Sequence, residues 1–295
     1  MANSITLAQK FVPMLDEVYK MASLTSDLDG APELARQGAN VNELIIPVLS
    51  MQGLGDYSRN GGYVNGDVTL TNETRKCNFD RGRMFSVDTM DNLETAGIAF
   101  GRLAGEFIRT KVVPELDAFR FAKYAGLTGI SKVSAGATLA DGAAVLKALR
   151  VATDKMDEDE VPSEQRYLYI TPTLLGTVQD LDTTKSREVL QNFAKVVKVP
   201  QSRFYTAIKQ LSGVNGGENA DESAGGFEKA TGAKDINFMV IHKPAVIQYT
   251  KHVAPKIIEP AVNQTADAYK FGYRNVGIAD AYQNKLAGIY LHHKA

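Results

Sequence analysis

One segment, Gly66 to Asp91, constrains the fold of this chain more than any other. Its apolar residues recur at the spacing of two that places side chains on one face of a β-strand. They are Val68 and Leu70 on a first arm and Cys77, Phe79, Phe85 and Val87 on a second. Between the arms, Asn72, Glu73 and Thr74 are typical of a turn. The pattern predicts a β-hairpin that leads directly into a helix.

This predicted hairpin is densely charged and has too little apolar surface to bury itself. Its cations are Arg75, Lys76, Arg81 and Arg83, and its acids include Asp80, Asp88 and Asp91. A lone two-stranded ribbon is only marginally stable in water. The hairpin therefore requires support, either from a partner molecule or from the edge of a sheet in its own domain.

The composition is that of an ordinary globular chain. With 295 residues and 44% hydrophobic content, it can bury the core of one large domain or two smaller ones. The 33 Lys and Arg balance 34 Asp and Glu, so no net field draws it to nucleic acid or an anionic membrane. The single cysteine, Cys77, excludes an internal disulfide. No apolar run approaches the ~18 residues of a membrane span, and Met1–Thr6 lacks the basic start and long apolar centre of a signal peptide, which favours a reducing cytosolic setting.

The first fifty residues are expected to form an arm. Apolar residues of 5–24 recur with helical spacing, and Pro13 predicts a helix that begins near it. A short strand is expected at Leu44–Leu49, where Pro47 indicates a sheet edge or a strand end.

A long helix is predicted after the ribbon. Asp91 and Glu94 have capping-box spacing at its start, Pro114 should kink or restart it, and Gly126 should end it. The following predicted elements mix helices and strands: a helix at 141–156, a strand at 166–171, a helix at 172–181, a strand at 236–242, a helical step at 244–248, and strands within 268–276 and 286–292. The acidic segment Asp154–Glu160 and the glycine-rich segment Gly213–Gly232 are expected to be exposed loops. Together these patterns predict an α+β fold.

No pattern indicates catalysis. Gly53-Leu54-Gly55 partly matches a dinucleotide fingerprint, but no helix follows to hold a pyrophosphate. The four histidines lack metal-binding spacing, and Cys77 is interpreted as an apolar ribbon residue. Phosphate loops and nucleophile elbows are missing from the sequence. We therefore expect no catalytic residue, no cofactor and no metal site.

An arm, a ribbon, a long helix and a mixed central region without a catalytic site are typical of a shell-building subunit. Three short motifs accompany this order: Pro114–Phe119 with Gly126 closing the helix, Ile241–Ala245, and Phe271–Arg274. With these features the chain resembles the major capsid proteins of tailed bacteriophages, the Hong Kong 97-type fold. The resemblance covers nearly the whole length, and the order of elements carries more of it than any single motif.

The resemblance implies an α+β Hong Kong 97-type capsid fold with defined divisions. These are an N-terminal arm at 1–50, an extended β-hairpin loop at 51–90, a peripheral domain with a spine helix at 91–135, an axial domain at 136–248, peripheral strands at 249–283 and a return to the axial domain at 284–295.

It also implies a function in assembly and not in catalysis. The chain is expected to form pentamers and hexamers of an icosahedral shell, which assembles in the host cytoplasm and encloses a double-stranded DNA genome in the virion. Expected partners are other copies of the chain, a portal and packaged DNA, contacted weakly and without sequence specificity because the net charge is only −1. A separate scaffolding protein is expected because the sequence begins almost at the arm. No membrane partner is expected.

The resemblance implies that the basic residues of the ribbon lie in an interface between subunits. Arg75, Lys76, Arg81 and Arg83 would meet acidic or carbonyl groups of an adjacent subunit. Two alternatives remain: an encapsulin, which is a compartment shell of the same fold around a cargo enzyme, and a soluble α/β enzyme with an unrecognised site. Portal and terminase genes nearby would indicate a phage, whereas a cargo gene would indicate an encapsulin.

Overall fold

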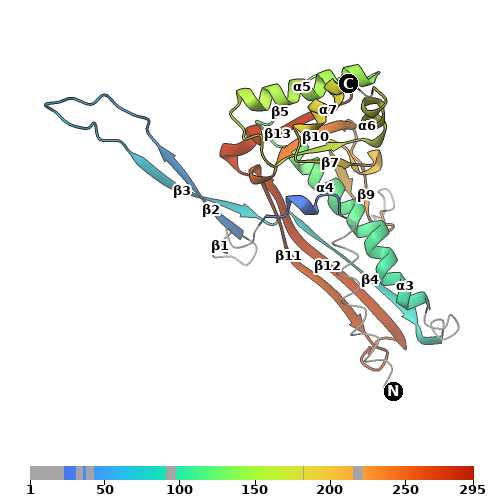
Figure 1. The fold of residues 1–295 in the computed structure, drawn as a ribbon. Helices are drawn as coiled ribbons and strands as arrows, with labels where there is room; N and C mark the ends of the chain where they lie inside the picture. Colours follow the sequence, from blue (N-terminus) through green and yellow to red (C-terminus); the bar gives the residue numbers. More distant parts are fainter. Residues whose placement is uncertain (1–22, 31–35, 38–42, 91–97, 182, 215–221) are drawn as a thin grey trace.

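The computed structural model describes residues 23–30, 36–37, 43–90, 98–181, 183–214 and 222–295. Figure 1 shows three parts: a sheet covered by helices, a long narrow sheet with a helix along it, and a hairpin that projects away from both. The predicted helix near Pro13 and the predicted capping pair Asp91 and Glu94 lie outside the described residues. Within the described ranges, no helix is long and apolar enough to cross a membrane.

The first part is a five-stranded mixed sheet. Its strands, in spatial order, are β5 (Ser131–Lys132), β13 (Ile289–His293), β10 (Ile236–His242), β6 (Arg166–Ile170) and β7 (Lys195–Lys198). The central strand β10 runs antiparallel to both neighbours, and all its residues are buried. Its sequence lacks polar alternation because both faces of the sheet are covered. The predicted strand at 236–242 is confirmed to the residue.

Helices cover one face of this sheet. They are α5 (Gly142–Glu158), α6 (Pro172–Gln179) and α7 (Thr184–Gln191). Val145 and Leu149 of α5 pack with Phe238 and Tyr290 of the sheet. The opposite face, which includes Tyr169, packs in a second cluster with residues of the long helix described next.

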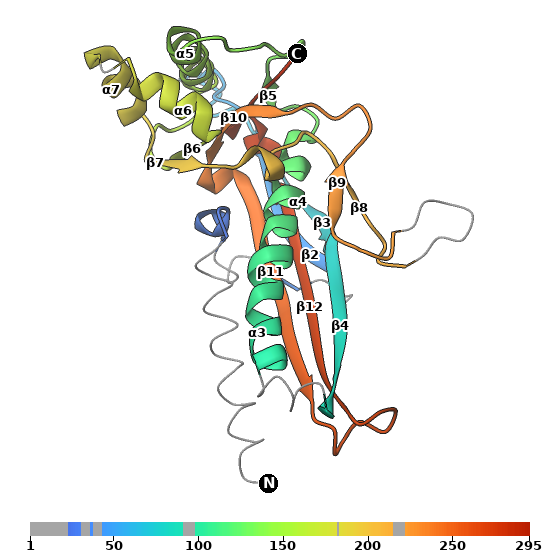
Figure 2. The same ribbon diagram turned by 90° about the vertical axis from the view of Figure 1, so that its right-hand side faces the viewer.

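The second part is a three-stranded antiparallel sheet of unusual length, in the order β11 (Val246–Ile258), β12 (Ala268–Ala281) and β4 (Phe79–Asp88). A spine helix lies along one face of it, as Figure 2 shows. The spine helix consists of α3 (Ile98–Phe107), a π-helical turn η3 (Ile108–Val112) and α4 (Val113–Ala125). In each strand, every second residue points toward this helix. Phe79 of β4 and Phe271 of β12 are two of these residues, and together with Ile108 and Leu116 of the helix they belong to the core of this second part.

The expected effect of Pro114 on the spine helix is confirmed. Proline cannot donate the backbone hydrogen bond of the helix interior, and the regular α pattern is interrupted by the π turn immediately before it. Pro114 then occupies the first turn of α4, a position that tolerates proline. The helix ends at Ala125, with Gly126 as its C-cap, as predicted.

The third part is the projecting hairpin, and it differs from the hairpin predicted from the sequence. The two arms of Gly66–Asp91 do not pair with each other: β3 (Val68–Lys76) pairs with β2 (Glu43–Met51), and β4 pairs with β12. Asn72 and Thr74 are therefore strand residues, because pairing with β2 outweighs their turn preference. The second arm instead forms the edge strand of a domain sheet, so the alternative of an edge hairpin is correct only in placing this arm at a sheet edge.

The strand predicted around Pro47 is longer than expected. It spans the whole of β2, and the short β1 (Arg36–Gln37) pairs with it only at Leu44 and Ile45. Beyond these two residues, no strand of the described ranges adjoins the outer side of β2. Pro47 thus lies at a local sheet edge, where its missing N–H costs no ladder hydrogen bond.

Two further predictions are wrong. The acidic segment Asp154–Glu160 is mostly helical, because α5 continues to Glu158 with Met156 buried on its inner face. Exposed pairs one turn apart, such as Lys155 with Asp159, support this last turn. The helical step at 244–248 is only the 3-10 turn η5 (Lys243–Ala245), after which β11 begins at Val246.

The remaining elements are short. They are the 3-10 turns η1 (Ser26–Leu28), η4 (Gln201–Arg203) and η6 (Gln283–Gly288) and the strands β8 (Ile208–Gln210) and β9 (Phe227–Lys229). The pair β8–β9 lies beside β4 (Figure 2) and carries the segment 211–226, named the glycine loop from here on. Its residues 215–221, which include the predicted exposed acids Glu218 and Asp221, lie outside the described residues.

Candidate functional site: the projecting hairpin, its anchor and the cleft beside the spine helix

The β2–β3 hairpin exposes apolar side chains that no described part of the chain covers. Of the fourteen large hydrophobic side chains exposed among the described residues, eight lie between positions 49 and 70. They are Leu49, Met51, Leu54, Tyr57, Tyr63, Val64, Val68 and Leu70. Isolated exposed hydrophobic residues are common, but such a concentration on one projection is typical of a surface that binds another protein.

The tip of the hairpin is structured. Ser58 and Gly62 exchange two backbone hydrogen bonds of 3.2 and 2.7 Å, and the Ser58 hydroxyl accepts a third from Gly61 N–H. Gly62 has φ +76°, a conformation that favours glycine. The rings of Tyr57 and Tyr63 meet edge to face with centroids 4.9 Å apart. We name the side chains of Leu54, Tyr57, Tyr63 and Val64 the knob.

The base of the hairpin is anchored to β12. Ile46 is buried against Ile278 of β12 and Ile247 of the adjacent β11. Arg75 bonds Asp280 Oδ2 at 3.4 Å and Glu73 Oε2 at 3.0 Å. These contacts fix the direction in which the hairpin leaves the body.

The junction between β3 and β4 is fixed to the same strand. The Asn78 amide donates to Ala279 O at 2.8 Å, and its oxygen accepts from Ala279 N–H at 3.1 Å. The side chain thereby continues the strand pairing where the backbone of Asn78 leaves it.

Two arginines on β4 hold the glycine loop. Arg81 Nη2 donates to the carbonyls of Leu211 (2.7 Å) and Gly226 (3.2 Å), and Arg83 donates to those of Ser223 (2.8 Å) and Ala224 (3.1 Å). A guanidinium can make several such bonds at once because its donors form a rigid fork.

The loop base is closed by an ionic contact as well. Glu222 accepts a hydrogen bond from Ser212 N–H and pairs with Lys209 at 2.7 Å. The Lys209 contact, followed by the Ser212 bonds, lowers the pKa of Glu222 to about 2. The base of the glycine loop therefore keeps these contacts at every pH at which Glu222 is ionised.

Arg81 also joins the long sheet to the spine helix. Its Nε donates to Glu115 Oε1 at 2.8 Å, and both side chains are largely buried. Burial raises the pKa of Glu115, while the charge and hydrogen bond of Arg81 act against the increase. The ionised form of Glu115 therefore depends on Arg81.

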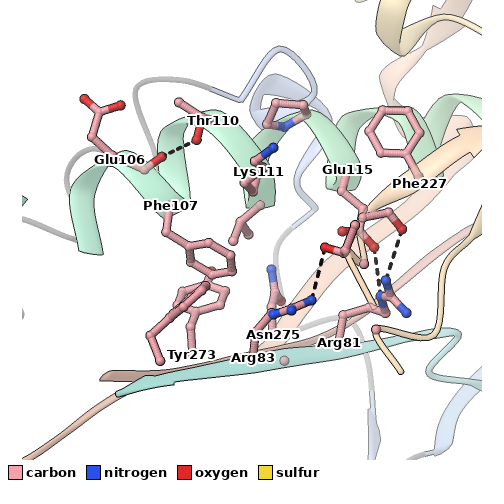
Figure 3. A pocket seen from close by; sticks show the side chains of 18 of the residues that line it. Arg81, Arg83, Glu106, Phe107, Thr110, Lys111, Glu115, Phe227, Tyr273 and Asn275 are labelled. Atoms are coloured by element: carbon pink, nitrogen blue, oxygen red, sulfur yellow. Dashed lines mark hydrogen bonds and ion pairs between the residues drawn. The ribbon is translucent and has the colours of Figure 1, made fainter. Parts of the chain in front are cut away.

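A cleft of about 620 Å³ opens between the spine helix, β4 and the glycine loop. Its floor is aromatic: Phe85 meets Phe107 with ring centroids 4.8 Å apart, and Phe107 meets Tyr273 at 6.3 Å. Figure 3 shows Phe107 descending from the helix toward Tyr273 on the sheet. Charged residues also line the cleft, including Arg83 and Lys111.

A second polar cluster fixes residues 23–30 to the body. The fully buried Asp117 of α4 accepts hydrogen bonds from Ser23, Leu24 and Thr25 and also pairs with Arg203 at 3.3 Å. Arg120, one turn later, donates to the Thr25 hydroxyl at 2.8 Å.

The same segment is held from the long sheet. Gln248 of β11 donates to Thr25 O at 2.6 Å and to Asp29 at 2.7 Å. Leu28 is buried with Phe121 and Tyr169, at the joint between the two sheet systems. We name residues 23–30 the joint plug, because they fill this joint.

The sequence patterns do not indicate this cluster. The only available indication was an acid, Asp117, between the apolar residues Leu116 and Ala118 of a helix. A charged residue in an amphipathic pattern is ordinarily interpreted as solvated.

The predicted interface cations occupy different environments. Arg75, Arg81 and Arg83 meet acidic or carbonyl groups, as expected of their chemistry, but these groups belong to the same chain. Lys76 ends β3 at the base of the hairpin. A role of all four in a subunit interface stays a prediction. Across the described ranges, no three His, Cys, Asp or Glu side chains gather as a metal site would require.

Comparison with solved structures identifies the architecture. The capsid of the cyanophage P-SCSP1u aligns with a TM-score of 0.54 and 13% identity, over 88% of this chain and 85% of that one. The mature capsid of bacteriophage PhiM1 aligns with a TM-score of 0.53 and 11% identity, over 86% and 82%. The chain has the Hong Kong 97-type fold. A virus-like particle from Pyrococcus furiosus shares this fold with a TM-score of 0.59 and 10% identity, over 96% and 98%.

The Hong Kong 97-type fold is thus shown by shape and not by sequence similarity. No family model and no curated protein matches the sequence. The recognition of this fold from the order of sequence elements is confirmed.

Proposed function

We propose that this chain is the major capsid protein of a tailed bacteriophage. Copies would assemble into pentamers and hexamers of an icosahedral shell around a double-stranded DNA genome. The observation that carries the proposal is the projecting hairpin, whose exposed apolar side chains have no partner within the described chain. A concentration of exposed apolar side chains marks a surface that binds another molecule, and the fold is that of shell-forming proteins.

The mechanism is assembly through a contact between different patches. A hairpin that reaches from one copy onto the body of the next uses two unlike surfaces, and such heterologous contacts close into rings when the rotation between copies permits. Each copy in a ring both gives and receives one hairpin. The rings would then join through their outer parts into a closed shell.

The proposed divisions of the chain follow the strand pairing. We assign the extended loop to residues 43–76, and the peripheral domain to the β4, β11 and β12 sheet with the spine helix. The axial domain would contain the five-stranded sheet and helices α5 to α7. The family resemblance implies an extended loop at 51–90, and the difference follows from the pairing of β3 with β2.

The proposed partners extend beyond other copies. A separate scaffolding protein and a portal would take part in assembly in the host cytoplasm, and the mature chain would reside in the virion. With a net charge of −1, the shell would hold DNA weakly and without sequence specificity. Catalysis has no part in this proposal.

Purification of the full chain tests the proposal directly. Expressed alone or with the scaffolding protein from its own genome, it should form closed particles of uniform size, visible by electron microscopy and light scattering. A chain that stays monomeric in both settings, with its hairpin resistant to protease, would contradict the proposal.

A compartment shell is the second candidate function. The likeness to the virus-like particle from Pyrococcus furiosus, which spans nearly the whole of both chains, favours it. Genes for a portal and a terminase beside this one would support the phage proposal. A neighbouring gene for a peroxidase or a ferritin-like cargo enzyme, whose product copurifies inside the particles, would support the compartment.

A further inference from the structure

The chain carries two complementary features, the knob at the tip of its hairpin and the aromatic cleft beside its spine helix. We propose that the knob of one copy inserts into the cleft of a neighbouring copy, with Asp56 of the tip paired to Lys111 of the cleft. The inference rests on the proposed function and adds to it the receiving surface and the residues that select it.

The knob is prepared for insertion. Tyr57 and Tyr63 are 62% and 88% exposed, yet their rings already contact each other and the turn beneath them is hydrogen-bonded. Val64 lies beside Gly55, where an added Cβ atom would come within 3.3 Å of the Val64 Cβ. Little conformational entropy remains to be lost on docking, which makes the apolar surface effective in binding.

The cleft is suited to such an occupant. Its volume of about 620 Å³ is in the range that accommodates a few large side chains, and Phe85, Phe107 and Tyr273 supply aromatic contacts for the two tyrosines. The edges and faces of these rings can pair with tyrosine rings in edge-to-face geometry.

The charges at the two sites are complementary. Asp56 of the tip is exposed and has no ion-pair partner in the part of the chain that the structure describes. Lys111 at the cleft is exposed and equally lacks a carboxylate partner among the described side chains. Arg83 adds positive charge because its described partners are neutral carbonyls. The cleft acids are already engaged: Glu115 pairs with Arg81, and Glu106 pairs with Arg109 at 2.8 Å.

The geometry makes this contact intermolecular. The hairpin extends to the upper left of Figure 1, whereas β4 and the spine helix, whose residues line the cleft, run toward the lower right, so a hairpin cannot reach the cleft of its own chain. Knob and cleft are also different patches, so each copy retains a free cleft and a free knob after one contact has formed. Such a contact propagates around a ring and does not stop at a dimer.

A charge exchange tests the pairing. Lys111→Glu places a carboxylate opposite Asp56 and should lower the yield of closed particles about tenfold. Adding Asp56→Lys to the same chain reverses both charges and should restore the yield to within about twofold of the unmodified protein. Lys123→Glu is the matched control, because Lys123 is exposed on the same helix and does not line the cleft. Failure of the double variant to recover, with each chain folded by circular dichroism, overturns the pairing.

A disulfide trap gives an independent measurement. In a Cys77→Ser background, Leu54→Cys on the knob and Thr110→Cys in the cleft should form intermolecular disulfides when assembled particles are oxidised with diamide. Denaturing gels without reductant should then show a ladder of linked chains, and either single cysteine variant should not. Particles that form normally without any ladder refute the knob and cleft contact while leaving the proposed function intact. Absence of particles from the unmodified protein refutes the proposed function itself.

Discussion

A Cβ atom added at Gly225 would lie 2.6 Å from Nη1 of Arg83. The glycine loop thus approaches the arginine so closely that a side chain at this position would displace the guanidinium, and Gly225 also has φ +64°. Arg83 holds the loop by the carbonyls of Ser223 and Ala224, so the missing side chain and the two hydrogen bonds are parts of one contact.

Gly225→Ala should displace the Arg83 guanidinium and free the glycine loop without unfolding the chain. The flexible arginine can move away, so the expected cost is about 1–2 kcal/mol of unfolding free energy, from backbone strain and lost hydrogen bonds. Gly226→Ala is the control for strain alone, because a Cβ there meets no atom within 4 Å. Limited proteolysis of the loop measures the effect. Gly225→Ala and Arg83→Ala should be non-additive, and full additivity would contradict this account.

Arg81→Met should destabilise the chain by about 1–3 kcal/mol, because Glu115 would lose the partner of its largely buried carboxylate. Burial raises the pKa of Glu115 already, and removal of Arg81 should raise it further. The double variant Arg81→Met with Glu115→Met should recover most of the loss, since neither charge remains. Urea unfolding of the purified chain measures both changes. A double variant less stable than Arg81→Met would contradict the argument.

Asp117→Ala should release the joint plug and cost about 3–5 kcal/mol, because several buried donors lose their acceptor together. Thr25→Ala removes only one hydroxyl from the cluster and should cost about 1–2 kcal/mol. Glu106→Ala, at an exposed position of the same helix, should change the stability by less than about 0.5 kcal/mol. Proteolysis at 23–30 together with urea unfolding gives the comparison. Equal stability of Asp117→Ala and Glu106→Ala would refute the role of the cluster.

Mild acid should weaken the five-stranded sheet through His292. This imidazole is buried, stacks on Phe238 and contacts the Asn237 amide at 3.0 Å. Burial, with a smaller effect of His293, lowers its pKa to about 4, so the folded chain binds fewer protons than the unfolded chain between pH 4 and 6.5. Stability is therefore complete above about pH 6.5 and falls by about 2–3 kcal/mol toward pH 4.

Unfolding curves at several pH values measure this loss. His292→Gln should flatten the pH dependence, because its side chain does not titrate. His242, whose pKa burial also lowers, should account for part of the remaining slope. A wild-type stability that is constant from pH 7 to pH 4.5 would rule out the effect.

Local sequence patterns predicted the elements whose type, helix or strand, does not depend on which other element they pair with. Strand β10 was predicted to the residue because Ile236–His242 is an apolar run covered on both faces. The interruption of the spine helix was predicted at Pro114 because proline lacks an N–H wherever it occurs. Asp141, which caps α5 by accepting a hydrogen bond from Ala144 N–H, begins the helix at the predicted place.

The candidate site could be predicted only in part. The sequence located the charged ribbon, and Arg81 and Arg83 do hold other groups through carbonyl and acidic partners. It did not predict that those partners belong to the glycine loop and the spine helix, more than thirty residues away in every case. Asp117 was missed because nothing local distinguishes a buried acid from a solvated one on a helix.

The sequence by itself determined the order and kind of most elements, because helix and strand periods depend on neighbouring residues. Their order then supported the resemblance that implied the Hong Kong 97-type fold. Only the tertiary structure decided which strands pair. The first arm of Gly66–Asp91 joins β2 in a projecting hairpin, and the second joins β12 in a domain sheet. The physical reason is that strand alternation specifies a face but not a partner, since any extended segment of suitable register can satisfy the same backbone hydrogen bonds.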